Sequence, residues 1–295
     1  MRVLIVGCGY VGTPLGAELV RRGHEVFGLR RNPAAAGELQ AEGIRPVFAD
    51  FTQRDQLESL PRNFDWVVNC AAPGGGTVEG YRALYLEGTN NLLGWLRAHP
   101  PRHYVYTSST SVYGQNDGSW VDEQSATEPG TETGDILVAT EQLVLKETVG
   151  KFPATILRST GIYGPGRGYW LRQFLAGEAR LEGQGGRFLN MIHRDDLAGS
   201  IIAVLLRGRP GQIFNACDCE PVTQRGLYTW LSEQLGRPLP PSVGENPESL
   251  RRRAVTNKRI SNGLLRREIG QTFLYPSFRE GYAAELKRLG VSLAD

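Results

Sequence analysis

The sequence contains no apolar run that approaches the roughly 18 residues needed to cross a bilayer. Its opening, MRVLIVGCG, carries an apolar stretch that glycine interrupts too early for the hydrophobic region of a secretory signal peptide. These two features argue against a membrane span and against a secretory leader. We therefore expect a cytoplasmic protein with no membrane partner.

Cysteine is scarce, and its spacing fits neither a disulfide framework nor a zinc site. The four cysteines are Cys8, Cys70, Cys217 and Cys219. Only the last two are close in sequence, and no His or Cys pair near them completes a set of metal ligands. We expect free thiols in a reducing compartment and no bound metal.

An excess of charge is also missing. The chain has 33 basic and 31 acidic side chains, a net charge of +2, which gives no broad basic surface for nucleic acid. The small excess is uneven, because residues 251–295 hold ten Lys and Arg against four Asp and Glu. We expect a small-molecule substrate and no nucleic acid partner.

Short β-rich runs alternate with helical segments through the first half of the chain. The runs are RVLIV, HEVFGL, RPVFA, DWVVNC, HYVYTS and ATILRS. The helical segments include Pro14 to Arg22, Gly80 to Ala98 and Asp135 to Val149. This alternation is typical of βαβ units. It predicts an α/β fold of the Rossmann type, with a doubly wound parallel sheet.

From about Gly164 the alternation breaks down. The segments YGPGRG, GEARLEGQGGRF and RPLPPSVGENPE are rich in glycine and proline, with helical stretches between them. We therefore expect a dinucleotide-binding core over residues 1–163, to which segments around 187–216 return. Residues 164–295 are expected to form mainly a smaller α+β substrate lobe.

The segment GCGYVG lies between the first strand and the first helix. Gly7 permits a tight turn, Gly9 lets the backbone approach a pyrophosphate, and Gly12 lets the helix pack on the strand. The helix N-terminus then attracts the phosphates. The motif predicts a dinucleotide site that includes Tyr10 and Val11; a merely structural turn is the alternative.

The second strand ends in GLRRN, where an acidic residue would favour NAD by binding the adenosine ribose hydroxyls. Arg30 and Arg31 instead place guanidinium groups where the 2′-phosphate of NADP would lie. The alternative is a pair of solvated arginines. We predict a preference for NADP, with NAD left open.

Eight motifs in this order resemble the extended short-chain dehydrogenase/reductases, in the atypical branch labelled NAD-dependent epimerase/dehydratase-like. They are GCGYVG, FADFTQRDQL, VNCAAPG, YLEGTNNLL, YTSSTSVYG, LRSTGIYGPGR, MIHRDDLA and IFNACDCEPVT, and they span nearly the whole chain. The resemblance implies further cofactor contacts. Asp50 and Phe51 would flank the adenine, Ala71, Ala72 and Pro73 would line the nicotinamide-side ribose and phosphates, and Ser159, Thr160 and Ile162 would approach the nicotinamide.

The family's catalytic Tyr-x-x-x-Lys pair is missing. None of the eleven tyrosines has a lysine four residues later. Alignment on the helix TEQLVLKE puts Thr133 in place of the tyrosine and Leu137 in place of the lysine, and neither can carry the proton. Thr133 is instead predicted to cap this helix. Tyr85 is a second departure, because the pattern implies asparagine there.

Three residues are candidates for the missing chemistry. Ser109 matches the family's catalytic Ser/Thr, and its alternative role is to satisfy loop backbone. Tyr163 is a candidate surrogate acid, although it and Tyr113 could equally pack against their own loops. His193 has an imidazole that titrates near neutrality, and its alternative role is to tie down the turn before a helix that starts near Asp195.

The basic C-terminal region has two readings. Arg251 to Arg253 could clamp an anionic substrate such as a diphosphate, or they could be solvated. Ser261 marks a helix start, and Arg266 and Arg267 are expected on that helix's solvated face.

Two functions therefore stay open from the sequence. One is an NADP-dependent reductase, epimerase or dehydratase that uses a nonstandard acid. The other is an NAD(P)-binding regulator or redox sensor without catalysis. The resemblance also suggests a homodimer, built from the helices at 80–98 and 135–149.

Overall fold

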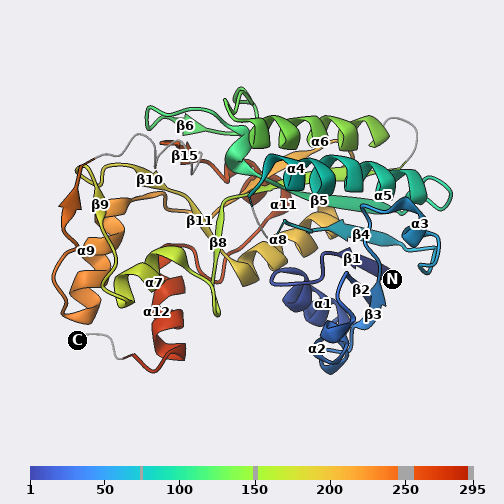
Figure 1. Ribbon diagram of the computed structural model, residues 1–295, viewed down its shortest axis with the longest axis horizontal. Helices are drawn as coiled ribbons and strands as arrows, with labels where there is room; N and C mark the ends of the chain where they lie inside the picture. Colours follow the sequence, from blue (N-terminus) through green and yellow to red (C-terminus); the bar gives the residue numbers. More distant parts are fainter. Residues whose placement is uncertain (74–75, 149–151, 245–255, 292–295) are drawn as a thin grey trace.

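Seven parallel strands form the sheet at the centre of the computed structural model, which describes residues 1–73, 76–148, 152–244 and 256–291 (Figure 1). Their spatial order is β12-β7-β5-β4-β1-β2-β3. Their bounds are β1 Arg2–Val6, β2 Glu25–Arg30, β3 Arg45–Phe48, β4 Trp66–Asn69, β5 His103–Ser109, β7 Ala154–Ser159 and β12 Ile213–Ala216. The chain winds outward from β1 in both directions, which confirms the predicted doubly wound fold.

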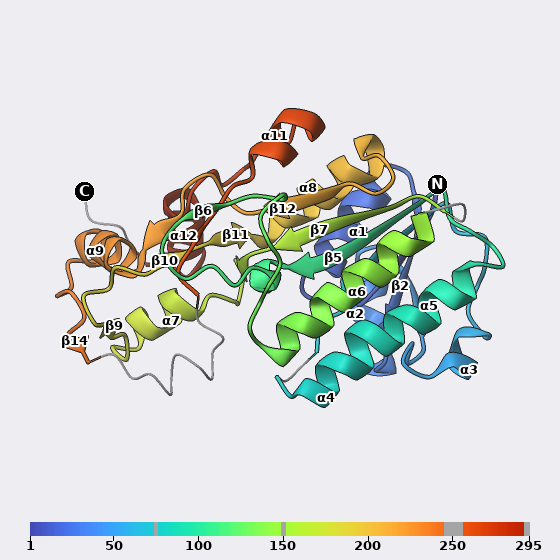
Figure 2. The same cartoon turned by 90° about the horizontal axis from the view of Figure 1, so that it is seen from above.

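Helices cover both faces of the sheet (Figures 1 and 2). One face carries α1 Gly12–Arg21, α2 Ala36–Ala41, α8 Arg194–Arg207 and α11 Gly263–Ile269, and the other carries α3 Arg54–Leu57, α5 Thr89–Leu96 and α6 Glu132–Thr148. Alternate residues of β1 serve the two faces: Val3 and Ile5 pack in the first layer, and Leu4 and Val6 in the second. This double burial explains why the strands read as continuous apolar runs.

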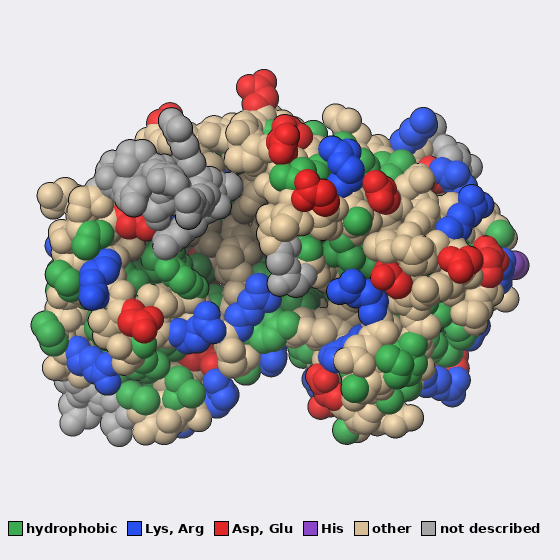
Figure 3. Space-filling view, viewed as in Figure 1, with side chains coloured by type: hydrophobic (Ala, Val, Ile, Leu, Met, Phe, Trp, Pro, Cys, Tyr) green, Lys and Arg blue, Asp and Glu red, His purple; other side chains and the backbone are tan. Residues whose placement is uncertain are grey.

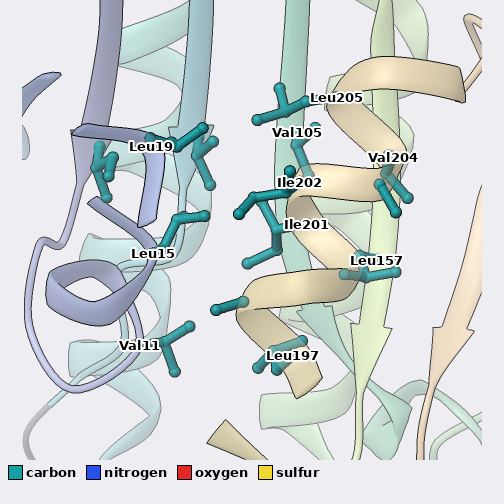
Figure 4. Packing of buried hydrophobic residues seen from close by; sticks show 14 of the residues in the cluster. Val11, Leu15, Leu19, Val105, Leu157, Leu197, Ile201, Ile202, Val204 and Leu205 are labelled. Atoms are coloured by element: carbon teal, nitrogen blue, oxygen red, sulfur yellow. The ribbon is translucent and has the colours of Figure 1, made fainter. Parts of the chain in front are cut away.

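Buried apolar side chains pack between α1 and α8 (Figure 4). Leu15 of α1 faces Ile201 and Ile202 of α8, and all three side chains are buried. Each such side chain contributes about 1.5–3 kcal/mol through burial. The α8 helix, which follows only the first segments of the substrate lobe in the sequence, is therefore held firmly on the cofactor half of the molecule.

The remaining elements form a smaller lobe beyond the carboxyl ends of the strands (Figure 2). Its helices are α7 Tyr169–Leu175, α9 Gln224–Leu235 and α12 Phe278–Arg288. Its strands pair two by two: β8 Gly161–Tyr163 with β11 Met191–His193, β9 Leu181–Glu182 with β14 Ser242–Val243, and β10 Phe188–Leu189 with β13 Val222–Thr223. A fourth pair, β6 Trp120–Val121 with β15 Arg259–Ile260, links the lobe to the loop after β5.

Helix ends differ in detail from the sequence predictions. The helix expected over 80–98 consists of α4 Val78–Tyr81, a π-helix η2 at Arg82–Gly88, and α5. Two short 3-10 helices, η1 Pro33–Ala35 and η3 Thr110–Val112, lie elsewhere in the chain. The prediction that Thr133 caps this helix is wrong, because α6 begins at Glu132 and the Thr131 hydroxyl oxygen accepts the Gly134 N–H at 3.2 Å.

Other predictions about helices agree with the structure. Ser261 accepts the Gly263 N–H at the start of α11, and Arg266 and Arg267 are exposed as expected. Helices α5 and α6 lie on one face of the sheet, and the homodimer built from this region stays a prediction. No helix in the described ranges is long and apolar enough to cross a bilayer.

A buried ion pair ties α6 to β7. Arg158 donates to both carboxylate oxygens of Glu141 at 2.7–3.2 Å, and each side chain is only 4% exposed. Arg158 also donates to the Tyr113 hydroxyl at 2.7 Å, which in turn donates to Asn215 at 2.9 Å. Tyr113 is thus a core residue, as its alternative reading predicted.

Replacing Arg158 with methionine should lower the free energy of unfolding by about 3–5 kcal/mol, because Glu141 would be left as an uncompensated buried charge. Urea unfolding followed by circular dichroism measures the loss. Arg209→Met, which removes a 73%-exposed partner of Glu268, is the matched control and should cost less than about 1 kcal/mol. Equal losses in the two variants would contradict the buried network.

His193 caps α8. Its Nδ1 accepts the Asp195 N–H at 3.2 Å, and the side chain is 1% exposed. Burial lowers the pKa of His193 to about 4, an effect that nearby Asp195 opposes and Arg194 reinforces. The imidazole is therefore neutral near pH 7, and the structural reading of this residue accounts for its contacts.

The His193 cap predicts a pH-dependent stability. Because the folded pKa lies below the ordinary value of about 6.5, the contribution is complete above pH 6.5 and is lost as the pH falls toward 4. His193→Asn keeps a capping oxygen but does not titrate. Wild type should therefore lose on the order of 1 kcal/mol or more relative to this variant over that window, in thermal unfolding at a series of pH values. Parallel curves for the two proteins would contradict the neutral, buried imidazole.

Candidate functional site

The glycine turn after β1 is built by close backbone contact. Gly7 has φ +77°, and a Cβ there would lie 2.4 Å from the Ala71 Cα. A Cβ on Gly12 would lie 2.9 Å from the Gly7 carbonyl oxygen and 3.0 Å from Ile5 Cγ2. At Gly9 the nearest atom is 3.9 Å away, so this position is open toward a ligand. Each glycine thus serves a different purpose in a dinucleotide site: Gly7 for the tight turn, Gly9 for the approach of a ligand, and Gly12 for the packing of α1 on β1.

A groove of about 830 Å³ opens at this turn. Most of the residues predicted to bind the cofactor line it, and they lie at or after the carboxyl ends of β1, β2, β3, β4 and β7: Gly7, Gly9, Tyr10, Val11, Arg30, Arg31, Phe51, Ala71, Ala72, Pro73, Ser159, Thr160 and Ile162. Open α/β sheets bind ligands at this kind of switch point. We call this region the cofactor groove.

Two predicted cofactor residues lie outside its lining. Gly12 sits beneath the turn, where it packs α1 on β1. The Asp50 carboxylate accepts hydrogen bonds from the backbone N–H and the hydroxyl of Thr52, at 3.0 and 2.8 Å. Asp50 therefore shapes the turn after β3, which presents Phe51 to the groove.

The two arginines after β2 have different environments. The Arg30 guanidinium contacts both oxygens of Glu38 at 3.0 and 3.1 Å, and it also donates to Thr13 and to the Cys8 carbonyl oxygen. Arg31 is exposed along the groove and has no ion pair among the described residues. Arg31 is thus the freer cation for an incoming phosphate.

A second pocket of about 560 Å³ adjoins the groove, sharing Gly161 and Ile162 with it. We call it the substrate pocket. Its further lining comes from the loop after β5, from α7, β10 and α12, and from the segment before β15: Thr110, Ser111, Tyr163, Tyr169, Trp170, Arg187, Phe188, Leu189, Asn190, Met191, Thr256, Lys258 and Tyr282. Figure 3 shows the hollows between the two parts of the molecule, with Lys and Arg side chains around them. Arg251 to Arg253, the predicted anion clamp, lie outside the described residues.

Ser109 lines the cofactor groove at the end of β5. Its hydroxyl donates to the Ser111 hydroxyl at 3.0 Å and accepts the Ser111 N–H at 3.1 Å. The side chain therefore satisfies the loop backbone and also faces the groove, so both predicted roles agree with its position.

Tyr163 does not reach the cofactor groove. Its ring is 2% exposed in the core of the smaller lobe, and its hydroxyl approaches the Ser277 carbonyl oxygen at 3.5 Å. A Cβ on Gly281 of α12 would lie 1.9 Å from this hydroxyl, so the missing side chain at 281 makes room for the phenol. Burial raises the pKa of Tyr163 far above its ordinary value. Tyr163 thus acts as a packing residue, which is its alternative reading.

The place of the missing Tyr-x-x-x-Lys pair is closed by packing. Leu137 is 2% exposed and packs with Val112, Tyr113 and Ile260. Tyr85, the second departure from the family pattern, lies on the π-helix and lines the cofactor groove. Burial raises the pKa of Tyr85, so its phenol is neutral.

The sequence reasoning missed three cations that line these cavities, Arg167, Arg187 and Lys258. Arg167 lines the cofactor groove, with its guanidinium carbon 5.2 Å from the centre of the Tyr10 ring. Lys258 lines the substrate pocket and is buried. The only sequence signal for Lys258 is that it is a lone lysine in a region otherwise rich in arginine.

Comparison with known proteins agrees with this geometry. The model of the NAD dependent epimerase/dehydratase family matches residues 3–217. Protein YeeZ of Escherichia coli K12 is 28% identical over 283 residues, covering 93% of this chain and 96% of that protein. The 2-alkyl-3-oxoalkanoate reductase of Stenotrophomonas maltophilia is 27% identical over 258 residues, covering 81% and 77%.

Solved structures show the same likeness. A putative NAD-dependent epimerase/dehydratase from Methylobacillus flagellatus is 32% identical, with a TM-score of 0.77 and 98% of each chain covered. UDP-glucuronic acid 4-epimerase from Bacillus cereus, solved with NAD, shares the fold at 20% identity, with a TM-score of 0.79 and 98% and 99% coverage. The chain therefore belongs to the NAD dependent epimerase/dehydratase family.

Proposed function

We propose that this chain is an NADPH-dependent reductase that transfers hydride to a carbonyl, or to a similarly polarised double bond, of a small molecule. The observation that carries the cofactor choice is Arg31, exposed beside the cofactor groove at the end of β2. A guanidinium there binds a 2′-phosphate in two hydrogen bonds and has no such partner on NAD. Arg30 is the second cation of the site, shared with Glu38.

The loss of the usual proton-transfer pair bears on the reaction that we propose. Epimerases and dehydratases that work through transient oxidation need a base to take the proton of an alcohol. Leu137 and Thr133 replace the pair that would supply this base. In a carbonyl reduction the same position would have to donate the proton, and Ser109, which lines the cofactor groove, would hydrogen-bond the reacting oxygen. Two relatives are named as reductases, the Stenotrophomonas enzyme and a ketoreductase of Stigmatella aurantiaca.

A nucleotide-binding regulator without catalysis is the second candidate, favoured by the loss of the same pair. Its redox-sensing form has little support in three of the four thiols, Cys219 being the exposed one. Burial raises the pKa of Cys8 to about 12 and also raises those of Cys70 and Cys217. These thiols form little thiolate near neutral pH, so their oxidation is disfavoured.

Replacing Arg31 with alanine should weaken NADPH binding by about 10- to 100-fold, because a hydrogen-bonded charge pair contributes about 1.5–3 kcal/mol. NADH binding should stay unchanged. Titration of the purified protein with the four cofactors, followed by nicotinamide and tryptophan fluorescence, measures both effects. Arg266→Ala, which removes an exposed arginine of α11, is the control and should leave all four affinities as in wild type.

Equal affinities of the wild type for NADPH and NADH would overturn the cofactor assignment. Binding of neither would overturn the reductase. If NADPH binds, its consumption with a panel of aldehydes, ketones, quinones and imines separates the reductase from the regulator, since a regulator would turn over none of them.

A further inference from the structure

Lys258 is a buried cation in the wall of the substrate pocket. The residue is only 4% exposed. The backbone around it is held from two sides. Arg259 of β15 pairs with Trp120 of β6, and the Asn190 side chain donates to the Lys258 carbonyl oxygen at 2.9 Å while accepting the Ile260 N–H at 2.8 Å. The ammonium position is therefore fixed by the fold.

Two neutral oxygens accept hydrogen bonds from the Lys258 Nζ. They are the Tyr113 carbonyl oxygen and the Thr256 hydroxyl, the latter at 2.7 Å. Tyr113 belongs to the same loop that carries Ser109, so this bond ties the ammonium to the edge of the cofactor groove. An ammonium has three N–H groups, and two are accounted for.

No carboxylate lines this pocket in the described part of the chain, and Lys258 forms no ion pair there. The other lining cation, Arg187, contacts Glu182 at 2.9 Å. The neighbouring Arg259 is not among the lining residues given above, and its guanidinium lies over the rings of Trp120 and Phe188.

The titratable groups of the lining other than lysine and arginine are phenols. Burial raises the pKa values of Tyr163 and Tyr282, and both stay neutral. Tyr169 lies at the exposed side. Burial without a counter-charge lowers the pKa of Lys258 to about 8, which is close to the range in which a general acid works best.

We propose that Lys258 donates the proton to the substrate oxygen, in place of the missing tyrosine, and that the substrate presents this oxygen on an aromatic or alicyclic body. This inference rests on the reductase function proposed above. The third N–H of the ammonium is the group that serves the substrate. The ring-bearing body matches a pocket wall formed by Tyr169, Trp170, Phe188 and Tyr282.

The two fixed acceptors suit both protonation states of the lysine. When a carbonyl carbon accepts hydride from the reduced cofactor, the π electron pair of the C=O bond moves to the oxygen. That oxygen takes the third Nζ proton, the alcohol forms, and the lysine becomes a neutral amine. The amine keeps two N–H groups for Tyr113 and Thr256, and its lone pair occupies the third position until water returns a proton.

A substrate-independent experiment tests the site. The sequence has four lysines, Lys146, Lys151, Lys258 and Lys287, so protein labelled with ¹³C at lysine Cε gives four resolvable signals, and Lys258→Arg assigns one of them. The Lys258 signal should titrate near pH 8, well below the ordinary lysine value of about 10.5. Benzoate, which offers an aromatic ring and an anionic oxygen, should raise the Lys258 midpoint by about one pH unit.

A Lys258 midpoint at that ordinary value would overturn the proposal, and so would a midpoint that benzoate leaves unchanged. These measurements need no cofactor. They therefore test the role of Lys258 independently of NADPH binding. A failure to bind NADPH would instead overturn the proposed function.

Kinetics with the carbonyl compound that is best consumed in the screen test the proton transfer itself. Lys258→Met should lower kcat by about 100-fold or more. Lys258→Arg keeps the charge but cannot release a proton near neutral pH, so it should be similarly slow. The wild-type rate should fall as the pH rises through about 8, and this fall should vanish in the Arg variant.

Lys287→Met, on the exposed face of α12, is the matched control and should keep wild-type kcat. NADPH affinity should be unchanged in all three variants, which excludes general misfolding. A Lys258→Arg enzyme with wild-type kcat and pH profile would show that charge, not proton transfer, is what the position supplies, and would overturn the proposal.

Discussion

The meeting of two backbones, at Gly7 and Ala71, is the constraint on which the site depends. The ends of β1 and β4 approach so closely there that no side chain fits on Gly7. In the sheet β1 lies between β2 and β4, and the chain passes first outward through β2 and β3 and then outward from β4 on the other side, so the groove opens where the two windings part. The arginines after β2, the alanines after β4 and the serines after β5 then reach one cavity because they share one edge of a parallel sheet.

Helix α6 shows that the structural and chemical parts of a motif can separate. Glu141 still forms its buried ion pair with Arg158, which holds the helix against β7. One turn earlier, Leu137 fills its place with an apolar side chain that packs against Tyr113 and Ile260. The helix is thus anchored as firmly as a catalytic one would be. A proton donor for the pocket has to come from another part of the chain.

The sequence predicted the parts of the fold that local patterns encode. Each of the six apolar runs became a strand of the sheet, and the glycine spacing located the cofactor groove, because both patterns report short-range geometry. It did not predict that α11 returns to the sheet or that Trp120 pairs with Arg259, since such contacts depend on packing between distant segments. The same limit applies to single side chains. Tyr163 looked available in the sequence, but its position is decided by the space left at Gly281.

The contact between Arg30 and Glu38 changes what two adjacent arginines mean for cofactor choice. A 2′-phosphate reaching Arg30 does not meet a bare cation, because a carboxylate already holds it in two hydrogen bonds. Binding there exchanges one anion for another, and the displaced Glu38 must be solvated again. At Arg30, selectivity for NADP over NAD would therefore depend on how much more favourably the guanidinium binds the 2′-phosphate than it binds the Glu38 carboxylate. On the NADP binding proposed above, this internal competitor would make the affinity lower than the count of arginines suggests.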